Sequence, residues 1–316
     1  MADEQITTPE VLVLGGGGIL GEAWMSAVLV GLDGSADFDS LGCGRYVGTS
    51  AGSIVAASLA AGHAPGARLG SLPEQPAHTE APPDDLIGSL FSTLGATAFR
   101  LGGAAAGPLA SLALDSSSTS GALLRRAALR RVPTGTASLG ALVTAVERSG
   151  VGWDGRLRVA AVEVESGRRV MFGSADAPAV SVAQAVHASC AIPGVFEPMR
   201  AGGLTFVDGG VWSPTNMDGA EIERGERVLC LNPTASMRFT PAAPIGGIGA
   251  MSKAIAAAEA LALRHRGALV TVVNPDPASA AALGSDLMDA SRRTRVIEAG
   301  LAQGRSLVGA RDDRAA

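Results

Sequence analysis

The sequence "RYVGTSAGSIVAA", residues 45–57, passes from a β-like run directly into residues that favour a helix. At the join, Ser50 lies between Gly48 and Gly52. A sharp strand-to-helix turn forces its central residue into a strained backbone conformation, and glycines on either side relieve the crowding. The pattern predicts a serine hydroxyl held above a sheet as a nucleophile. The alternative is an ordinary turn in which Ser50 or Ser53 caps the helix.

The composition indicates a globular protein with an aliphatic core. Hydrophobic residues make up 47% of the 316 residues but aromatic ones only 3%, and there are 42 glycines. A chain of this length forms one large domain or two modest ones. The net charge of −5 comes without a basic tract, so we expect no nucleic-acid partner.

Cysteine usage and the apolar pattern indicate an intracellular setting. Cys43, Cys190 and Cys230 show no C-x-x-C spacing and predict neither a disulfide framework nor a zinc site. The first residues, "MADEQ", lack the features of a signal peptide, and no apolar stretch of about 18 residues predicts a membrane span. We expect a cytoplasmic protein, free or peripheral at a membrane, without metal or cofactor. Its oligomeric state stays open.

Strand-like and helix-like segments alternate along the chain. Strands alternating with helices predict an α/β fold with a mainly parallel sheet covered on both faces. The expected strands lie at 11–14, 45–50, a pair within 157–173, 203–208, 227–233 and 267–276, and the expected helices at 19–32, 51–62, 122–132, 138–150, 181–190, 247–265, 283–290 and 292–308.

A glycine loop, "GGGGILG" at 15–21, follows the first strand. Gly16, Gly18 and Gly21 fit G-x-G-x-x-G, which is also the fingerprint of dinucleotide-binding proteins. That alternative requires an acidic residue at the end of the second strand. Asp37 and Asp39 stand at about the right distance, but in a segment typical of a loop.

The same loop can form an oxyanion hole. Backbone N–H groups at the start of a helix are free and carry partial positive charge, and glycines let a carbonyl oxygen approach them. Such preorganised donors supply a large electrostatic contribution to acyl transfer. We predict Gly17 and Gly18 as the donors, because their loop and the Ser50 turn can lie at the carboxyl ends of adjacent strands.

A serine nucleophile requires a base, and histidine is scarce in this chain. The four histidines are His63, His78, His187 and His265. His63 and His78 lie in or beside a loop-rich segment, and His187 lies on an expected helix, where a surface or packing role is the simpler explanation. His265 lies between two arginines at the end of an expected helix.

Asp208 is the better candidate for the base. It ends an expected strand, and Gly209 and Gly210 after it leave its carboxylate accessible. A carboxylate within hydrogen-bonding distance of a serine hydroxyl can take its proton directly. The alternative for Asp208 is an ordinary Asp-Gly turn.

Residues 63–118 interrupt the alternation of strands and helices. We predict one domain over 9–310 with 63–118 as a loop-rich insertion, in which 86–114 is apolar but broken by glycines and Pro108. This stretch is either core helix or a mobile apolar cap that meets an acyl chain or a membrane surface. As a cap, it would contact lipid through Leu90, Phe91, Leu94 and Phe99.

Four motifs in this order resemble the patatin-like phospholipases: a strand-GGGxxG-helix unit, GTSAG, "ASCAIPGVFEP" and a final DGG. The resemblance covers roughly 11–62 and 180–233. It implies a three-layer α/β/α sandwich that hydrolyses lipid acyl esters without metal or nucleotide. It also implies that Ser50 is the nucleophile and Asp208 its base, a dyad without histidine.

The resemblance extends to smaller features and includes one departure. Pro193 and Phe196 match a segment that packs near the site in this family, and Asn216 matches an asparagine often found soon after the aspartate. Many members carry Arg or Lys where this chain has Leu20, a position from which a cation could steer a phosphate headgroup. Phospholipids, neutral acylglycerols and simple esters therefore all remain candidate substrates.

Two other functions remain compatible with the sequence. An α/β-hydrolase with a Ser-Asp-His triad would require His265 to reach Ser50, because no other histidine follows Asp208. A lipid-binding or regulatory protein could keep the fold without turnover, although the intact Ser50 and Asp208 argue against it.

Overall fold

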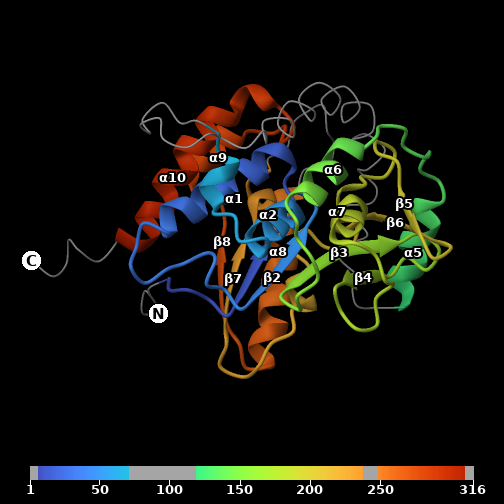
Figure 1. Cartoon of the computed structure of the whole chain (residues 1–316), viewed down its shortest axis with the longest axis horizontal. Coiled ribbons are helices and arrows are strands. Elements are labelled where there is room, and N and C mark those ends of the chain that lie inside the picture. Colours follow the sequence, from blue (N-terminus) through green and yellow to red (C-terminus); the bar gives the residue numbers. More distant parts are fainter. Residues whose placement is uncertain (1–5, 71–118, 238–247, 310–316) are drawn as a thin grey trace, which may run out of the picture.

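A central eight-stranded sheet with helices on both faces forms the molecule (Figure 1). The computed structural model describes residues 6–70, 119–237 and 248–309. The strands are β1 (Val11–Leu14), β2 (Arg45–Thr49), β3 (Leu157–Glu163), β4 (Arg169–Phe172), β5 (Met199–Ala201), β6 (Leu204–Asp208), β7 (Arg227–Leu231) and β8 (Leu269–Val273). Their order is β5-β6-β3-β2-β1-β7-β8, and β4 also pairs with β3.

Eight α-helices lie in the described part of the chain. They are α1 (Gly18–Leu32), α2 (Ala51–Ala60), α5 (Thr119–Leu129), α6 (Gly140–Arg148), α7 (Val182–Cys190), α8 (Ile248–His265), α9 (Pro277–Leu283) and α10 (Arg293–Gly309). The helix expected at 283–290 is wrong. Asp276 caps a helix that starts earlier, at Pro277, and Gly284 ends it with a φ of +70°, which suits glycine.

Alternation along the strands divides the core into two layers. Leu12 and Leu14 of β1 pack into one core with α1, α2, α6, α7 and α10, whereas Val11 and Val13 pack into another with α8. Successive side chains of a strand point to opposite faces, so a strand of four buried apolar residues needs helices on both sides. The expected three-layer α/β/α sandwich is confirmed.

The sheet is parallel at its centre and antiparallel at one end. β1 pairs in parallel with β2 and β7, β2 with β3, and β7 with β8. β3 pairs antiparallel with β4 and β6, and β5 with β6. The expected strand pair within 157–173 is therefore present as β3 and β4.

Strands β2 and β6 meet end to end along one edge of β3. Ala160 of β3 pairs with Thr49 of β2, and Ala161 pairs with Asp208 of β6. Both alanines also pair with β4, which occupies the other edge of β3. Since β2 runs parallel and β6 antiparallel to β3, their carboxyl ends converge there. This register brings the residues that follow β2 next to Asp208.

None of the described helices combines the length and the apolar character that a bilayer crossing requires.

Candidate active site

Ser50 occupies the strained strand-to-helix turn that the sequence predicts. Its φ is +50° and its ψ −124°. Side chains on the flanking residues would not fit, because a Cβ at Gly48 would lie 2.4 Å from the Ser53 Cα and one at Gly52 would lie 2.0 Å from the Leu14 carbonyl oxygen. Strain of this kind persists only where surrounding structure imposes it, and it is concentrated at functional sites.

The capping alternative fails for both serines. Within the described residues, the Ser50 side chain accepts no hydrogen bond from α2. The Ser53 hydroxyl donates to the Ser50 carbonyl oxygen at 2.6 Å instead. The Ser50 hydroxyl is therefore available for other partners.

Asp208 is one of those partners. Its carboxylate is 5% exposed, and its Oδ1 accepts from the Gly210 amide at 2.7 Å. Burial raises the pKa of Asp208 to about 7, against hydrogen bonds from Gly210 and from the Ser50 side chain that lower it. A general base works best with a pKa near the working pH, so this carboxylate is suited to accept the Ser50 proton.

The turn after Asp208 has no room for a side chain. A Cβ at Gly209 would lie 2.4 Å from the Ala160 carbonyl oxygen of β3. This glycine therefore lets the chain stay against the sheet while Gly210 turns its amide back onto the carboxylate. The site depends on this close approach, which an ordinary Asp-Gly turn does not require.

The glycine loop lies beside Ser50. A Cβ at Gly16 would lie 3.5 Å from the Ser50 Cβ, and the Gly16 amide donates to the Pro214 carbonyl at 2.8 Å. The amides of Gly17 and Gly18 have no acceptor among the described residues. A Cβ at Gly17 would lie 2.6 Å from the Pro233 Cγ, and one at Gly21 would lie 3.1 Å from the same atom. Free amides next to a serine are what an oxyanion hole requires.

Part of the segment that was expected to be helical at 283–290 packs against this loop. Gly18 has a φ of +58°, and a Cβ on it would lie 2.7 Å from the Met288 Sδ and 2.9 Å from the Leu287 carbonyl oxygen. The same Leu287 oxygen accepts from the Leu20 amide at 3.0 Å. The loop is thus held in place from outside.

We expect Gly18→Ala to lower kcat for ester hydrolysis by about a hundredfold, the scale of losing one oxyanion donor. The methyl group must displace either the 287–288 segment or the loop, which misaligns the amides. Gly62→Ala is the matched control, because Gly62 also has a positive φ, +83°, but has open space around it. Equal kcat values for the two variants, measured on a p-nitrophenyl ester, would exclude the loop from the site.

A family model described as "Patatin-like phospholipase" matches residues 12–220. The chain belongs to the patatin-like phospholipase family. Members of this family are in general lipid acyl hydrolases. Twelve chains of solved structures also match; one is VipD from Legionella pneumophila, 18% identical with a TM-score of 0.47, a match that covers 97% of this chain and 68% of that chain. No match was found among curated proteins.

The end of α7 holds both candidate residues of this patatin-like chain. The Ser189 hydroxyl accepts from the Ser50 amide at 2.8 Å, and the Ala191 carbonyl accepts from the Asp208 amide at 3.0 Å. Between them, the Cys190 Sγ lies 3.8 Å from the Ser53 Oγ. Ser189 was not predicted as a site residue from the sequence. Its only signal is a small polar residue in the last turn of a helix, within the family-like segment "ASCAIPGVFEP".

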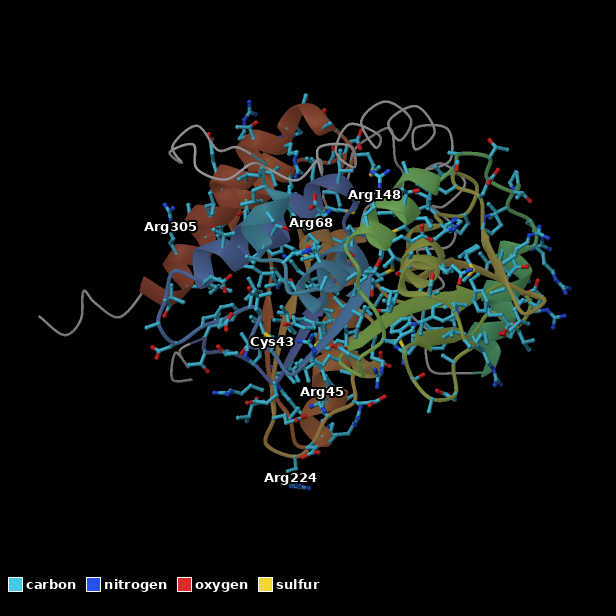
Figure 2. The ribbon with its side chains drawn as sticks, viewed as in Figure 1. Cys43, Arg45, Arg68, Arg148, Arg224 and Arg305 are labelled. Atoms are coloured by element: carbon cyan, nitrogen blue, oxygen red, sulfur yellow. The ribbon has the colours of Figure 1, made fainter. Side chains whose placement is uncertain are left out.

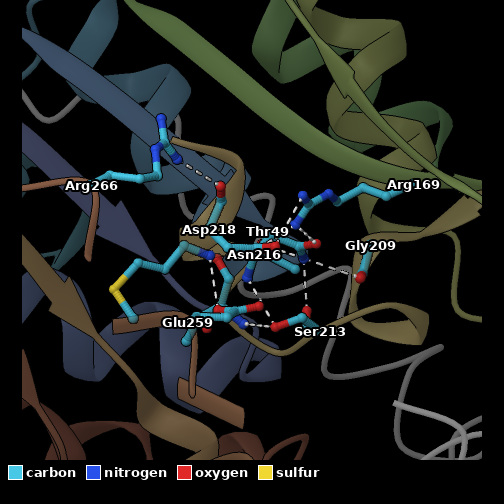
Figure 3. Close-up of polar contacts among 10 residues, drawn as sticks. Thr49, Arg169, Gly209, Ser213, Asn216, Asp218, Glu259 and Arg266 are labelled. Atoms are coloured by element: carbon cyan, nitrogen blue, oxygen red, sulfur yellow. Dashed lines mark hydrogen bonds and ion pairs between the residues drawn. The ribbon is translucent and has the colours of Figure 1, made fainter. Parts of the chain in front are cut away.

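Asn216 holds the other side of the site (Figure 3). It has a φ of +49°, and its Nδ2 lies 3.1 Å from the Thr49 Oγ1, 3.2 Å from the Gly209 carbonyl and 2.7 Å from the Ser213 carbonyl. Thr49 precedes Ser50, and Gly209 follows Asp208. This asparagine, noted from the resemblance, therefore joins the two candidate catalytic segments from behind. The resemblance also named Pro193 and Phe196: both are buried, and Phe196, 4% exposed, lies beside Ala137.

Glu22 fixes the helix that follows the glycine loop. It is 7% exposed and accepts from the Arg68 Nε at 2.7 Å and from the Arg293 Nη1 at 2.8 Å. Burial alone would raise the pKa of Glu22, but the two arginines outweigh it and keep the pKa below its ordinary value. The position of Arg68 near α1 is visible in Figure 2. This buried cluster was not predicted from the sequence.

The histidines in the described residues lie elsewhere. His265 is exposed at the end of α8, just before β8, and hence at the edge where the parallel strands begin, opposite the edge that carries Ser50. The His187 Nε2 contacts the Glu197 carbonyl at 3.1 Å, and His63 is exposed beyond α2. His78 lies outside the described residues.

Two other expectations concern ligand binding. Asp37 and Asp39 lie in the loop between α1 and β2, so no acidic residue ends the second strand as dinucleotide binding requires. The expected cap residues Leu90, Phe91, Leu94 and Phe99 lie outside the described residues. Leu20 is fully buried, so the position that carries a cation in many relatives is part of the apolar core here.

Proposed function

We propose that this protein is a serine acyl hydrolase that cleaves lipid acyl esters through a Ser50–Asp208 dyad. One observation carries the proposal: the hydroxyl of a serine in a strained turn does not cap its helix but hydrogen-bonds to the buried Asp208 carboxyl. The family is the second support, because patatin-like phospholipases are lipid acyl hydrolases in general.

The first half of the reaction forms an acyl-enzyme. The Asp208 carboxylate takes the proton of the Ser50 hydroxyl as the oxygen attacks the ester carbonyl carbon. The amides of Gly17 and Gly18 stabilise the negative charge on the carbonyl oxygen. When the carbon–oxygen bond to the alcohol breaks, the leaving oxygen takes the proton from Asp208.

The second half regenerates the enzyme. A water molecule gives a proton to Asp208 and attacks the acyl carbon, and the Ser50 oxygen leaves with the proton that Asp208 returns. The products are a fatty acid and an alcohol. The chain needs no metal or nucleotide for these steps, since every proton moves between the ester, water, Ser50 and Asp208.

The substrate we propose is a lipid ester without a required anionic headgroup. With Leu20 in place of a cation, the glycine loop itself offers no side chain to bind phosphate. Residues 86–114 are proposed as the apolar surface that receives the acyl chain, through direct contact with a lipid aggregate or a membrane surface.

Labelling with a fluorophosphonate probe tests the proposal. We expect one adduct per chain, on the peptide that contains Ser50, identified by mass spectrometry. The His265→Ala variant should react with the probe and hydrolyse ester at the wild-type rates, because His265 ends α8 near the start of β8, at the opposite edge of the sheet from Ser50. Loss of labelling in His265→Ala would support a Ser-Asp-His triad, and absence of labelling in the wild type would support a non-catalytic lipid-binding protein.

A further inference from the structure

A buried acid lies behind the site, on the opposite face of the sheet. Glu259 is in α8, is 6% exposed and is the only acidic residue of that helix. It lies beyond the segment matched by the family model, which ends at residue 220. None of the steps described above uses it.

The carboxylate of Glu259 collects three donors from one loop. It accepts from the Thr215 hydroxyl and, at 3.0 Å, from the Met217 amide, and the Ser213 side chain is the third donor. Figure 3 shows Glu259 facing this loop, residues 213–217. A buried carboxylate is costly unless its lone pairs are satisfied, so the loop and the acid stabilise each other.

The Ser213 hydroxyl links the backbone of this loop to Glu259. Its Oγ accepts from the Thr215 amide at 3.2 Å and from the Asn216 amide at 3.1 Å. Because both lone pairs of the hydroxyl are then used, its proton is left for Glu259. The backbone on either side of Asn216 is therefore fixed through the acid.

Asn216 connects the 213–217 loop to the residues next to Ser50 and Asp208. Its side chain contacts the Thr49 Oγ1 and the Gly209 carbonyl, and the Thr49 Oγ1 also donates to the Thr215 carbonyl at 3.3 Å. Thr49 and Gly209 adjoin Ser50 and Asp208 in the chain. Only the loop therefore separates Glu259 from the groups that flank the dyad.

We propose that Glu259 is a positioning residue for the hydrolase. By holding the 213–217 loop, it keeps Asn216 in the conformation that joins the two catalytic segments and sets the approach of the Ser50 hydroxyl to Asp208. This inference rests on the proposed function. It adds to the proposed site a residue from the opposite side of the sheet.

The main test is Glu259→Gln. A glutamine has nearly the same shape as glutamate but only one acceptor oxygen. Its NH₂ group would face the donors of the 213–217 loop, so at least one of those donors would lose its acceptor. An unsatisfied buried donor has a large effect, so we expect kcat for a p-nitrophenyl ester to fall about ten- to hundredfold. KM should change less than about threefold, because no substrate contact is lost. The rate of fluorophosphonate labelling should fall with kcat.

A double-mutant cycle identifies the path. If Glu259 acts through Asn216, then Glu259→Gln in an Asn216→Ala background should lower kcat by less than about threefold. If the fold-changes in kcat of the two single variants instead multiply fully in the double variant, the proposal is wrong. An unchanged kcat in a folded Glu259→Gln protein would also overturn it.

Two further variants keep the test decisive. Thr215→Val removes one donor to Glu259 at constant shape, so it should lower kcat in the same direction even if Glu259→Gln does not fold; an unchanged kcat would then count against the proposal. Glu147→Gln, at an exposed position of α6, is the control and should behave as wild type. Ser50→Ala distinguishes failure of the proposed function from failure of this inference. If Ser50→Ala keeps its turnover, the proposed function is wrong. If Ser50→Ala loses turnover while Glu259→Gln keeps the wild-type kcat, only the inference about Glu259 is wrong.

Discussion

Ser50→Ala should abolish ester hydrolysis, with a fall in kcat of at least about 10⁴-fold. The hydroxyl oxygen is the atom that forms the acyl-enzyme in the proposed mechanism, and no other described group replaces it at that place. The fold should persist, because alanine meets the same backbone conformation as serine and keeps the amide that donates to the Ser189 hydroxyl at 2.8 Å. Turnover of a p-nitrophenyl ester and the melting temperature measure the two effects.

Ser58→Ala is the matched control for this variant. Ser58 is 9% exposed on α2, the helix that begins directly after Ser50, but lies near the other end of that helix. It should keep the wild-type kcat. Turnover that survives Ser50→Ala in purified, folded protein would remove Ser50 from the mechanism and with it the proposed dyad.

The local features of the site could be predicted from sequence because each depends on neighbouring residues. The turn at Ser50 requires small residues two positions away on either side, and Gly48 and Gly52 supply them. The DGG turn is similar, since Gly209 and Gly210 adjoin the aspartate that they place. The alternation of strands and helices likewise predicts the layers of the fold.

The supports of the site could not be predicted, because they join residues far apart in the chain. Ser189 contacts the Ser50 amide across 139 positions, and Asn216 contacts Thr49 across 167. Glu259 is visible in sequence only as a lone acid in an alanine-rich helix. Its importance depends on which way that helix faces, which is decided by packing against the sheet.

One local prediction failed for a reason that is also physical. The segment after α9 contains residues that favour a helix, but Gly284 ends the helix with a positive φ. The following residues then pack Leu287 and Met288 onto the glycine loop. Tertiary contact with Gly18 therefore overrides local preference at this position.

Asp208→Asn should separate activity from stability. We expect kcat to fall about 10⁴-fold, as for the loss of Ser50, because members of a catalytic unit do not contribute additively. An amide oxygen can still accept from the Gly210 amide, so the turn should be kept. What disappears is the group that takes the Ser50 proton in the proposed mechanism.

The same substitution should stabilise the protein at neutral pH. Burial raises the pKa of Asp208 from 3.8 to about 7, so the folded chain holds this proton more tightly than the unfolded chain. As pH rises from about 4 to about 7, the unfolded carboxyl ionises first and the folded state loses stability. Glu259, whose pKa burial also raises to about 7, acts in the same direction. Asparagine removes the Asp208 part of this penalty, at most about 4 kcal/mol.

Wild-type activity and stability should therefore move in opposite directions between about pH 5 and pH 8. kcat should rise with an apparent pKa near 7 as Asp208 ionises, while the melting temperature falls. In Asp208→Asn the fall in melting temperature should be shallower. Asp276→Asn is the control, because asparagine caps α9 as well as aspartate does and should leave kcat unchanged. A full kcat in Asp208→Asn, or a lower melting temperature than wild type at pH 8, would show that Asp208 is a structural turn residue, because a base held near neutrality by burial must cost stability when it ionises.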